Sequence, residues 1–162
     1  MASITITTPV GPFTILARDG TVLAAGFTAD VDALLPLVHR DLRTSGDADL
    51  DRPAKAVRAY FDGDLTAIDD IAVEQRGGPF LTTAWDALRA VPAGAPVTYT
   101  TFAAAAGRPA AVRAAAQACA RNAAGLFVPC HRVVRTDGTL GGYRWGIEIK
   151  EFLLRHESET GS

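Results

Sequence analysis

The sequence predicts an α/β protein in two parts, an N-terminal α/β domain over residues 1–76 and a helix-turn-helix domain over residues 77–157. Apolar and polar residues alternate near the N-terminus, as in strands, whereas most segments after residue 79 have helical character. The run Arg-Gly-Gly-Pro at 76–79 breaks the backbone pattern between them. Charge also divides the chain, because residues 1–76 hold 7 Lys and Arg against 12 Asp and Glu, whereas 77–157 hold 9 against 5. Residues 158–162 are expected to form a flexible tail.

The first segment predicts a β-meander. Residues 4–7, 13–17 and 22–27 are rich in apolar and β-branched side chains and are separated by turn signals. Asp19 and Gly20 form a tight hairpin turn between the second and third of these strands. We therefore expect three consecutive strands at the N-terminus.

Two helices and a further strand are expected in the rest of the N-terminal part. Asp30 can cap a helix over residues 31–42, and Pro53 suits the first turn of a second helix over 53–61. Residues 45–51 are a loop, and residues 68–73 are expected to form a strand. This part holds no cysteine and no glycine-rich phosphate loop, so it is expected to be a scaffold.

The C-terminal part predicts four helices, over residues 81–91, 102–106, 109–121 and 147–156. Thr100 or Thr101 would cap the second helix, and Pro109 would open the third. The second and third helices, joined by a turn at Gly-Arg-Pro 107–109, fit a helix-turn-helix. An αα-hairpin without a role in nucleic-acid binding has the same pattern.

The arginines of the C-terminal part indicate a polyanionic partner. Between Arg108 and Arg144 there are six arginines and a single acid, Asp137. This asymmetry suggests nucleic acid, although a solvated arginine-rich surface would have the same composition. The excess of positive charge is mild, so it predicts salt-sensitive phosphate contacts rather than tight general binding.

Composition limits the other classes of function. The sequence is 48% hydrophobic and 21% charged, which is typical of a globular protein, and it has neither an apolar run near 18 residues nor a visible secretory signal. No membrane contact is therefore expected. Its two cysteines, Cys119 and Cys130, do not make a disulfide framework and suit the reducing cytoplasm. They form no CxxC pair, so no metal site is expected.

The run Pro-Cys-His-Arg-Val-Val at residues 129–134 is the most informative stretch of the chain. Neighbouring cationic groups favour the thiolate of Cys130, which is the nucleophilic form. Apolar residues on both sides predict a buried or cleft-lining position. A lone cysteine is also commonly a small core residue, so the local sequence leaves both interpretations open.

This run resembles the active-site signature of the O6-alkylguanine-DNA alkyltransferases, self-alkylating DNA repair proteins. The resemblance extends from Phe80 to Glu157, and residues 135–146 look most like the alkyltransferase half of the bacterial adaptive-response protein. The other matching segments are Phe-Leu-Thr-Thr-Ala-Trp at 80–85, Val-Pro-Ala-Gly at 91–94, Thr-Tyr at 98–99, Gly-Arg-Pro at 107–109, Val-Arg-Ala at 112–114, Asn122 and Gly-Gly-Tyr-Arg-Trp-Gly at 141–146.

The resemblance implies a ribonuclease H-like N-terminal domain and a winged-helix-like C-terminal domain. It also implies irreversible transfer of a methyl group from O6-methylguanine in DNA, and less readily from O4-methylthymine, to Cys130. The protein would be a monomer, need no cofactor and be consumed in the reaction. It would bind double-stranded DNA through the minor groove and flip the alkylated guanine out of the duplex.

The resemblance assigns catalytic roles to four residues. Cys130 is the acceptor, and His131 draws the thiol proton through a bridging water. Glu157 orients His131, in the manner of a hydrolase triad. Asn122 bonds the backbone near the cysteine, although the proline that usually follows it is Ala123 here.

Seven further residues are expected to contact DNA or support the site. Arg113 would fill the gap left by the flipped base, Tyr99 would meet the base and the 3′ phosphate, and Ala114 would let its helix approach the groove closely. The pocket near guanine O6 and the loop beside it would be formed by Val133, Tyr143, Arg144 and Lys150. Many relatives carry a small residue at the position of Arg144, so the pocket here is expected to be narrower.

Two other functions fit parts of the sequence. A non-catalytic lesion-binding protein of the alkyltransferase-like kind would flag damage, but those proteins replace the cysteine that is Cys130 here. A plain DNA-binding regulator would use the helix-turn-helix without depending on Cys130. The four-cysteine zinc module of the adaptive-response protein is absent from this sequence.

Overall fold

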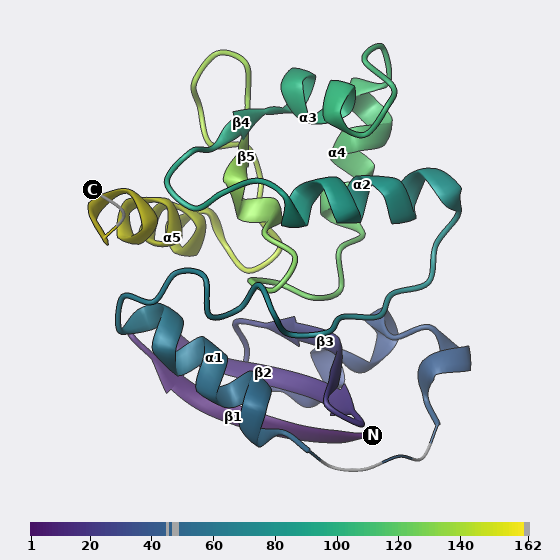
Figure 1. The fold of residues 1–162 in the computed structure, drawn as a ribbon, viewed down its shortest axis with the longest axis vertical. Helices are drawn as coiled ribbons and strands as arrows, with labels where there is room; N and C mark the ends of the chain where they lie inside the picture. The colour runs from purple at the N-terminus through teal and green to yellow at the C-terminus, as the bar shows by residue number, and fades with distance from the viewer. Residues whose placement is uncertain (45, 47–48, 161–162) are drawn as a thin grey trace. The chain divides into compact units, whose positions relative to one another are not determined.

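Two units divide the chain in the computed structural model, which describes residues 1–44, 46 and 49–160 (Figure 1). Unit 1 comprises residues 1–76 together with 123–127, and unit 2 comprises residues 77–122 and 128 onward. The segment 123–127 is therefore separated from the rest of unit 1 by 46 residues of unit 2, Gly77 to Asn122. Nothing in the sequence pattern indicated this excursion.

The sheet of unit 1 has three antiparallel strands in the order β1 (Ala2–Thr8), β2 (Gly11–Arg18) and β3 (Thr21–Gly26). Asp19 and Gly20 both have positive φ, as a type I′ hairpin turn requires, so the predicted meander is confirmed. Five consecutive buried residues in β2 and in β3 place apolar side chains on both faces of the sheet. Helix α1 (Asp51–Phe61) packs against β1 (Figure 1).

The prediction of a single helix over residues 31–42 is wrong. Three short 3₁₀ helices replace it, η1 (Val31–Ala33), η2 (Leu35–Leu37) and η3 (Arg40–Leu42). Pro36 explains the difference, because it has no N–H to donate and its ring would clash with the carbonyl four residues earlier. The expected cap is present, since the Asp30 side chain accepts a hydrogen bond from the backbone N–H of Asp32.

The prediction of a strand over residues 68–73 is also wrong. Its backbone N–H groups are used in local turns, with Asp69 N donating to Thr66 O and Ile71 N to Ile68 O. Only Val73 makes a bridge, parallel to Val22. In the loop expected over 45–51, residues 45, 47 and 48 lie outside the described residues, and Asp51 already begins α1.

The segment 123–127 continues the edge of the unit 1 sheet. Ala25 N donates to Ala123 O at 2.9 Å and Gly125 N donates to Ala25 O at 2.9 Å, a short parallel pairing with β3. Ala123 N also donates to the side-chain oxygen of Gln75 at 2.9 Å. A proline at position 123 would lack this N–H, so the alanine found here gains a hydrogen bond.

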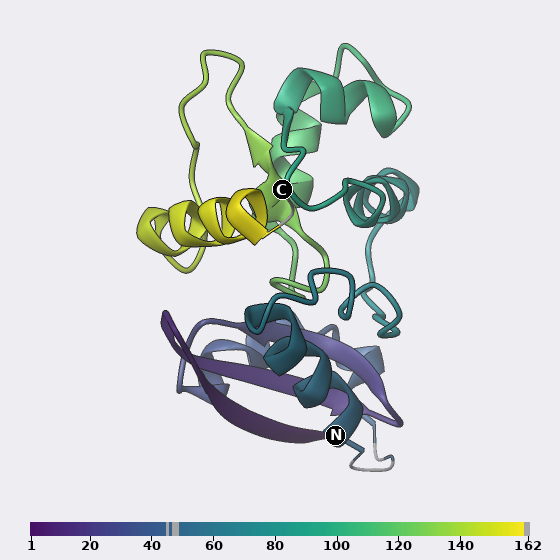
Figure 2. The ribbon, with the colours of Figure 1, turned by 60° about the vertical axis from the view of Figure 1, so that its left-hand side comes forward.

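Unit 2 surrounds a two-stranded parallel sheet with four α-helices (Figure 2). The Trp85 indole N–H donates to Ala118 O at 3.0 Å and joins the first of these helices to the third. The elements of unit 2 in chain order are α2 (Pro79–Arg89), β4 (Val97–Thr98), α3 (Tyr99–Ala105), α4 (Val112–Ala120), η4 (Cys130–Arg132), β5 (Val133–Val134) and α5 (Ile147–Thr160).

The helices of unit 2 exist where the sequence predicted them, with shifted ends. Thr98, rather than Thr100 or Thr101, caps α3, because its hydroxyl oxygen accepts from Thr101 N. Pro109 lies in the turn, and α4 begins three residues later. Helix α5 continues through Thr160, so residues 158–160 of the expected tail are helical, while 161–162 lie outside the described residues.

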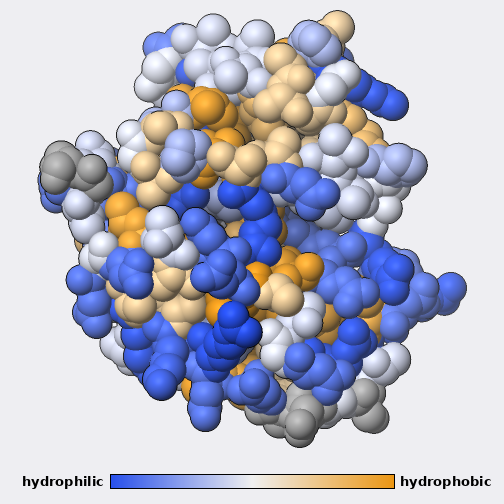
Figure 3. Space-filling model, viewed as in Figure 1, coloured by the Kyte–Doolittle hydropathy of each residue, from blue (hydrophilic) through white to orange (hydrophobic). Residues whose placement is uncertain are grey.

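Small apolar side chains cover much of helix α4. Ala116 and Ala120 are exposed, Ala114 is partly exposed and Val112 keeps 37% of its surface exposed. Pale and tan residues are visible over this part of unit 2 in Figure 3. Among the described residues, no helix is both long and apolar enough to span a membrane.

Candidate active site around Cys130

A tight backbone turn positions Cys130 at the start of η4. Cys130 N donates to Val128 O at 2.8 Å, and Arg132 N donates to Pro129 O at 3.0 Å. Val128 and Pro129 are buried, whereas the cysteine remains partly exposed. The turn therefore holds a partly exposed cysteine on a fixed backbone.

Asn122 braces this turn from the end of helix α4. Its side-chain amide donates to Val128 O at 2.7 Å and also hydrogen-bonds the Cys130 thiol. Asn122 is itself 5% exposed, so its rotamer is held by packing. The Asn122 side-chain amide thus contacts both the backbone of the loop at Val128 and the thiol of Cys130.

The pKa of the Cys130 thiol is set by residues distant in sequence. Burial raises this pKa, and the hydrogen bond from Asn122 is the largest effect that lowers it, followed by the charges of Lys150 and Arg144. The sequence predicts this role for cationic neighbours of the cysteine. That assignment is wrong for Arg132, whose guanidinium points to Glu157 instead.

Glu157 joins His131 and Arg132 in a buried cluster. Its Oε2 lies 2.7 Å from His131 Nε2 and accepts from an Arg132 terminal nitrogen at 3.0 Å, while its Oε1 accepts from Arg132 Nε at 2.9 Å. The other terminal nitrogen of Arg132 donates to Val91 O at 2.8 Å. His131 and Glu157 are fully buried and Arg132 is 2% exposed, so every charge in the cluster has a partner.

Charge and burial together keep His131 neutral and Glu157 ionised. Burial, with the charges of Arg132 and Lys150, lowers the pKa of His131, although the charge and the hydrogen bond of Glu157 raise it. Although burial by itself would raise the pKa of Glu157, the charge and hydrogen bond of His131, with Arg132, lower it to about 2. With Glu157 ionised, the imidazole proton lies on Nε2 and Nδ1 has a free lone pair. Nδ1 has no hydrogen-bond partner among the described atoms, so it can act as a base.

Lys150 ties two loops of unit 2 together from helix α5. Its fully buried ammonium donates to Val133 O at 2.8 Å and to Gly142 O at 3.3 Å. Burial lowers the pKa of Lys150, and the charges of Cys130 and Cys119 oppose this effect. Because Val133 pairs with Val97 across the two-stranded sheet, Lys150 also fixes β5.

Tyr143 and Arg144 follow the second of these loops. The Tyr143 ring lies edge-on to His131 with centroids 6.5 Å apart, and its buried hydroxyl has no partner among the described atoms. Burial raises the pKa of Tyr143 well above its usual value. Arg144 donates to the carbonyl of Ala120 at the end of α4, so it closes the last turn of that helix.

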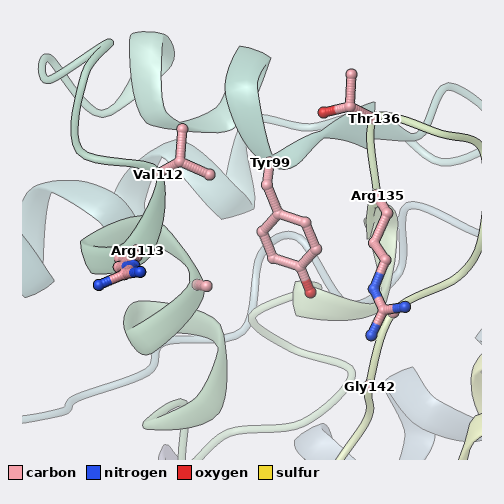
Figure 4. A pocket seen from close by; sticks show the side chains of 8 residues that line it. Tyr99, Val112, Arg113, Arg135, Thr136 and Gly142 are labelled. Carbon is pink, nitrogen blue, oxygen red and sulfur yellow. The ribbon is translucent and has the colours of Figure 1, made fainter.

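A hollow of about 390 Å³ opens beside the start of helix α4 (Figure 4). Tyr99 stands in its wall, and burial with the charges of Cys119 and Cys130 raises the pKa of its hydroxyl to about 12. Of the expected DNA-contacting residues, Tyr99 and Arg113 line this hollow, whereas Ala114 does not. The complete lining is Tyr99, Val112, Arg113, Ala116, Arg135, Thr136, Gly141 and Gly142.

The structure adds three residues to the candidate site. Arg132 holds Glu157, Arg135 lines the hollow, and Cys119 lies near enough to Cys130 for its charge to raise the Cys119 pKa. The signal for Arg132 was an arginine inside an apolar run, because a buried arginine needs a carboxylate partner. Within the described part of the chain, no group of three metal-ligating side chains occurs.

Comparison with known families gives one match over half of the chain. The model of the 6-O-methylguanine DNA methyltransferase DNA-binding domain matches residues 79–159. The chain is 52% identical over 90 residues to the bifunctional transcriptional activator/DNA repair enzyme Ada of Escherichia coli, covering 56% of this chain and 25% of Ada. It is 47% identical over 98 residues to the methylated-DNA–protein-cysteine methyltransferase of Salmonella typhimurium, covering 60% of this chain and 57% of that protein. The match therefore spans little more than half of that relative and a quarter of Ada.

A longer match is made with the methylated-DNA–protein-cysteine methyltransferase of Methanosarcina barkeri, which is 41% identical over 107 residues, covering 66% of this chain and 67% of that protein. Among solved structures, Mycobacterium tuberculosis OGT in complex with DNA superposes with a TM-score of 0.82 at 30% identity, covering 98% of this chain and 93% of that one. The O6-methylguanine-DNA methyltransferase of Pyrococcus kodakaraensis gives 0.71 at 25% identity, with 96% and 99% covered.

Proposed function

This chain belongs to the 6-O-methylguanine-DNA methyltransferase family, and we propose that it repairs DNA by moving the O6-alkyl group of guanine, mainly methyl, irreversibly onto its own Cys130. O4-methylthymine is a slower substrate. The observation that carries the proposal is the buried His131–Glu157–Arg132 cluster directly after Cys130, with a free lone pair on His131 Nδ1. Titratable side chains with perturbed pKa values gather at functional sites, and this cluster directly follows a partly exposed thiol.

The cluster would work as a relay for one proton. His131 Nδ1 takes the thiol proton through a water, and Glu157 stabilises the imidazolium that forms. Arg132 is a positioning residue that keeps Glu157 ionised and in one orientation. The hydrogen bond from Asn122 and the charges of Lys150 and Arg144 stabilise the thiolate.

The transfer step is a displacement at the alkyl carbon. A bond forms between the Cys130 sulfur and that carbon while the bond from carbon to guanine O6 breaks, and the departing guanine gains a proton in place of the one lost by the thiol. A thiolate suits this step because it is a strong, soft nucleophile. The thioether has no route back to a thiol here, so each molecule acts once and needs no cofactor.

Unit 2 would bind the DNA. Helices α3 and α4 form the helix-turn-helix of a winged-helix-like domain over residues 77–157, with α4 in the minor groove, where Ala114 permits close approach. The alkylated guanine flips out, Arg113 fills its place in the stack, and Tyr99, Val133, Tyr143 and Arg144 receive the base. Residues 1–76 are a ribonuclease H-like scaffold. The protein would act as a monomer in the cytoplasm, where its thiol stays reduced.

Intact-protein mass measured after incubation with a duplex holding one O6-methylguanine tests the proposal. We expect a single added methyl group, mapped to the peptide that contains Cys130, and no change with an unmodified duplex. An unmodified mass with the lesion still bound would instead assign the protein to the damage sensors. A methyl group mapped to Cys119 would refute the choice of acceptor.

A further inference from the structure

Arg135 directly follows β5 and brings an unused positive charge to the hollow. Its backbone is fixed, because Arg135 N donates to Thr139 O at 2.9 Å and Gly138 N donates to Arg135 O at 3.0 Å. Its side chain is exposed, and within residues 1–44, 46 and 49–160 the guanidinium makes neither an ion pair nor a hydrogen bond. A rigid backbone therefore carries a cation that no protein group neutralises.

The hydroxyl of Tyr99 converges with Arg135 on the same point of the backbone. A Cβ placed on Gly141 would lie 3.3 Å from the Tyr99 hydroxyl oxygen and 3.6 Å from Arg135 Cγ. Gly141 has φ +74°, a conformation that favours glycine, so the wall between the two side chains stays open. Figure 4 shows the guanidinium and the hydroxyl pointing the same way, with Arg113 on the far side of Tyr99.

The charges around this point are mostly positive. Arg113 lines the opposite wall, and the charge of Arg135 helps to lower the pKa of Lys150. The acid that faces Arg135 is Asp137, and its Oδ1 accepts both the N–H and the hydroxyl of Thr139, at 3.0 and 2.7 Å. Among the described residues Asp137 makes no ion pair with Arg135, so the hydrogen-bond donors of the guanidinium are left for an anion from outside the protein.

We propose that Arg135 binds the backbone phosphate on the 3′ side of the flipped nucleotide, the same phosphate that the Tyr99 hydroxyl is expected to meet. This inference rests on the proposed function. A guanidinium can bind two phosphate oxygens at once, and a protonated phenol is a donor. With Arg113 filling the gap in the stack from the opposite wall, Arg135 would hold the backbone while the base turns toward Cys130.

Transfer rates from four proteins test the role of Arg135. Wild type, R135A, R135K and R40A react with a duplex that holds one O6-methylguanine and with the free base O6-methylguanine, which has no phosphate. Arg40 is the matched control, since its side chain is 90% exposed and lies in unit 1. We expect R135A to slow the duplex reaction about 10-fold and to lower its salt dependence by about one ion, with R135K intermediate. R135A should not slow the free-base reaction, and R40A should slow neither.

Two further duplexes identify the phosphate. Each carries a neutral methylphosphonate on one side of the lesion. The duplex that is neutral on the 3′ side should slow wild type at least as much as the R135A substitution does, and should slow R135A much less than it slows wild type, because only the contact with Tyr99 is left to weaken. The proposal would be overturned if the rate loss caused by R135A and the rate loss caused by the methylphosphonate multiply at both positions. Equal rates for R135A and R40A would also overturn it. So would equal slowing of R135A on the duplex and on the free base. If wild type transfers no methyl group from any substrate, the proposed function itself fails, whereas normal transfer by R135A defeats only the phosphate contact.

Discussion

Within its described residues, unit 1 buries the hydroxyls of Thr8 and Thr14 but no charged side chain. Unit 2 buries four titratable side chains in a similar length of chain, His131, Arg132, Lys150 and Glu157. A buried ion pair loses its hydration, and well-packed apolar residues in its place are often as stable or more so. The difference teaches that unit 2 keeps charges that its folding does not require. The chemistry proposed at Cys130 accounts for their cost.

Replacing the acceptor should have the largest effect on the chemistry of unit 2. We expect Cys130→Ser to abolish methyl transfer, because a serine hydroxyl at neutral pH is a far weaker nucleophile than a thiolate, while lesion binding persists. Intact mass and a gel-shift assay with the same duplex measure the two effects. Cys119→Ser is the control and should still accept one methyl group. Residual transfer by the Cys130 variant would move the acceptor elsewhere.

Removing the carboxylate should damage both stability and rate. Glu157→Gln should cost about 3–5 kcal/mol of unfolding free energy, because Arg132 stays buried without its partner. Transfer should slow roughly 10²-fold, since the imidazolium of His131 loses its stabilising charge. Chemical denaturation and single-turnover rates measure these effects.

The same variant has a characteristic pH signature. The folded-state pKa of Glu157, about 2, lies below its ordinary 4.5, so its contribution to stability is complete above pH 4.5 and is lost as the pH falls toward 2. Wild type should therefore lose its advantage over Glu157→Gln across that window. A constant difference in stability down to pH 2 would show that the carboxylate contributes no charge-dependent stability.

Arg113→Ala should affect duplex DNA alone. The Arg113 side chain is exposed on helix α4 and is not part of the buried cluster around Glu157. Because the variant loses the side chain that supports base flipping, we expect transfer from a duplex to slow roughly 10–100-fold. Reaction with a free base should keep its rate. Parallel single-turnover assays decide the matter, and equal slowing on both substrates would contradict the flipping role.

Lys150→Met should shift the pH dependence of transfer. The positive charge of Lys150 lowers the pKa of Cys130, so its removal raises that pKa and moves the rate profile toward alkaline pH. At neutral pH we expect a loss of several-fold, which recovers as the pH rises. The matched control is Lys55→Met, because Lys55 is the chain's other lysine and is exposed on α1. Identical profiles for the two variants would remove Lys150 from the electrostatics of the thiol.

A core truncation in unit 1 should change stability without changing chemistry. Leu23 is 1% exposed in β3, and Leu23→Ala should lower the unfolding free energy by about 2–5 kcal/mol. The transfer rate per folded molecule should stay the same, measured below the unfolding transition. A slower chemical step in this variant would break the distinction between the two units.

The sequence predicted the local features well because their causes are local. The type I′ turn at Asp19-Gly20 follows from two residues that tolerate positive φ, and both appear as expected. The helix over 31–42 failed because apolar spacing was weighed above Pro36, whose missing N–H prevents a continuous helix. The strand over 68–73 failed because short turns satisfy its backbone first.

The candidate site shows the complementary limit. The motif drew attention to Cys130 and His131, but Arg132 Nε reaches Glu157, 25 residues away in sequence, and Lys150 reaches Val133, 17 residues away. Those pairings depend on how α5 packs beside η4, and no periodicity in the chain encodes that packing. The cationic neighbour Arg132 was therefore assigned to the wrong partner.

The excursion at residues 123–127 has a consequence for the order in which the chain matures. Val73 can pair with Val22 of β3 early, but during synthesis the edge at Ala25 stays unpaired until Ala123 and Gly125 emerge from the ribosome, well after residues 1–76 have been made. An open edge of this kind invites pairing with other chains. Unit 1 can therefore be completed only when residues 123–127 have been made, and these immediately precede the loop that carries Cys130. A nascent chain thus gains Cys130 at about the time that unit 1 can finish folding.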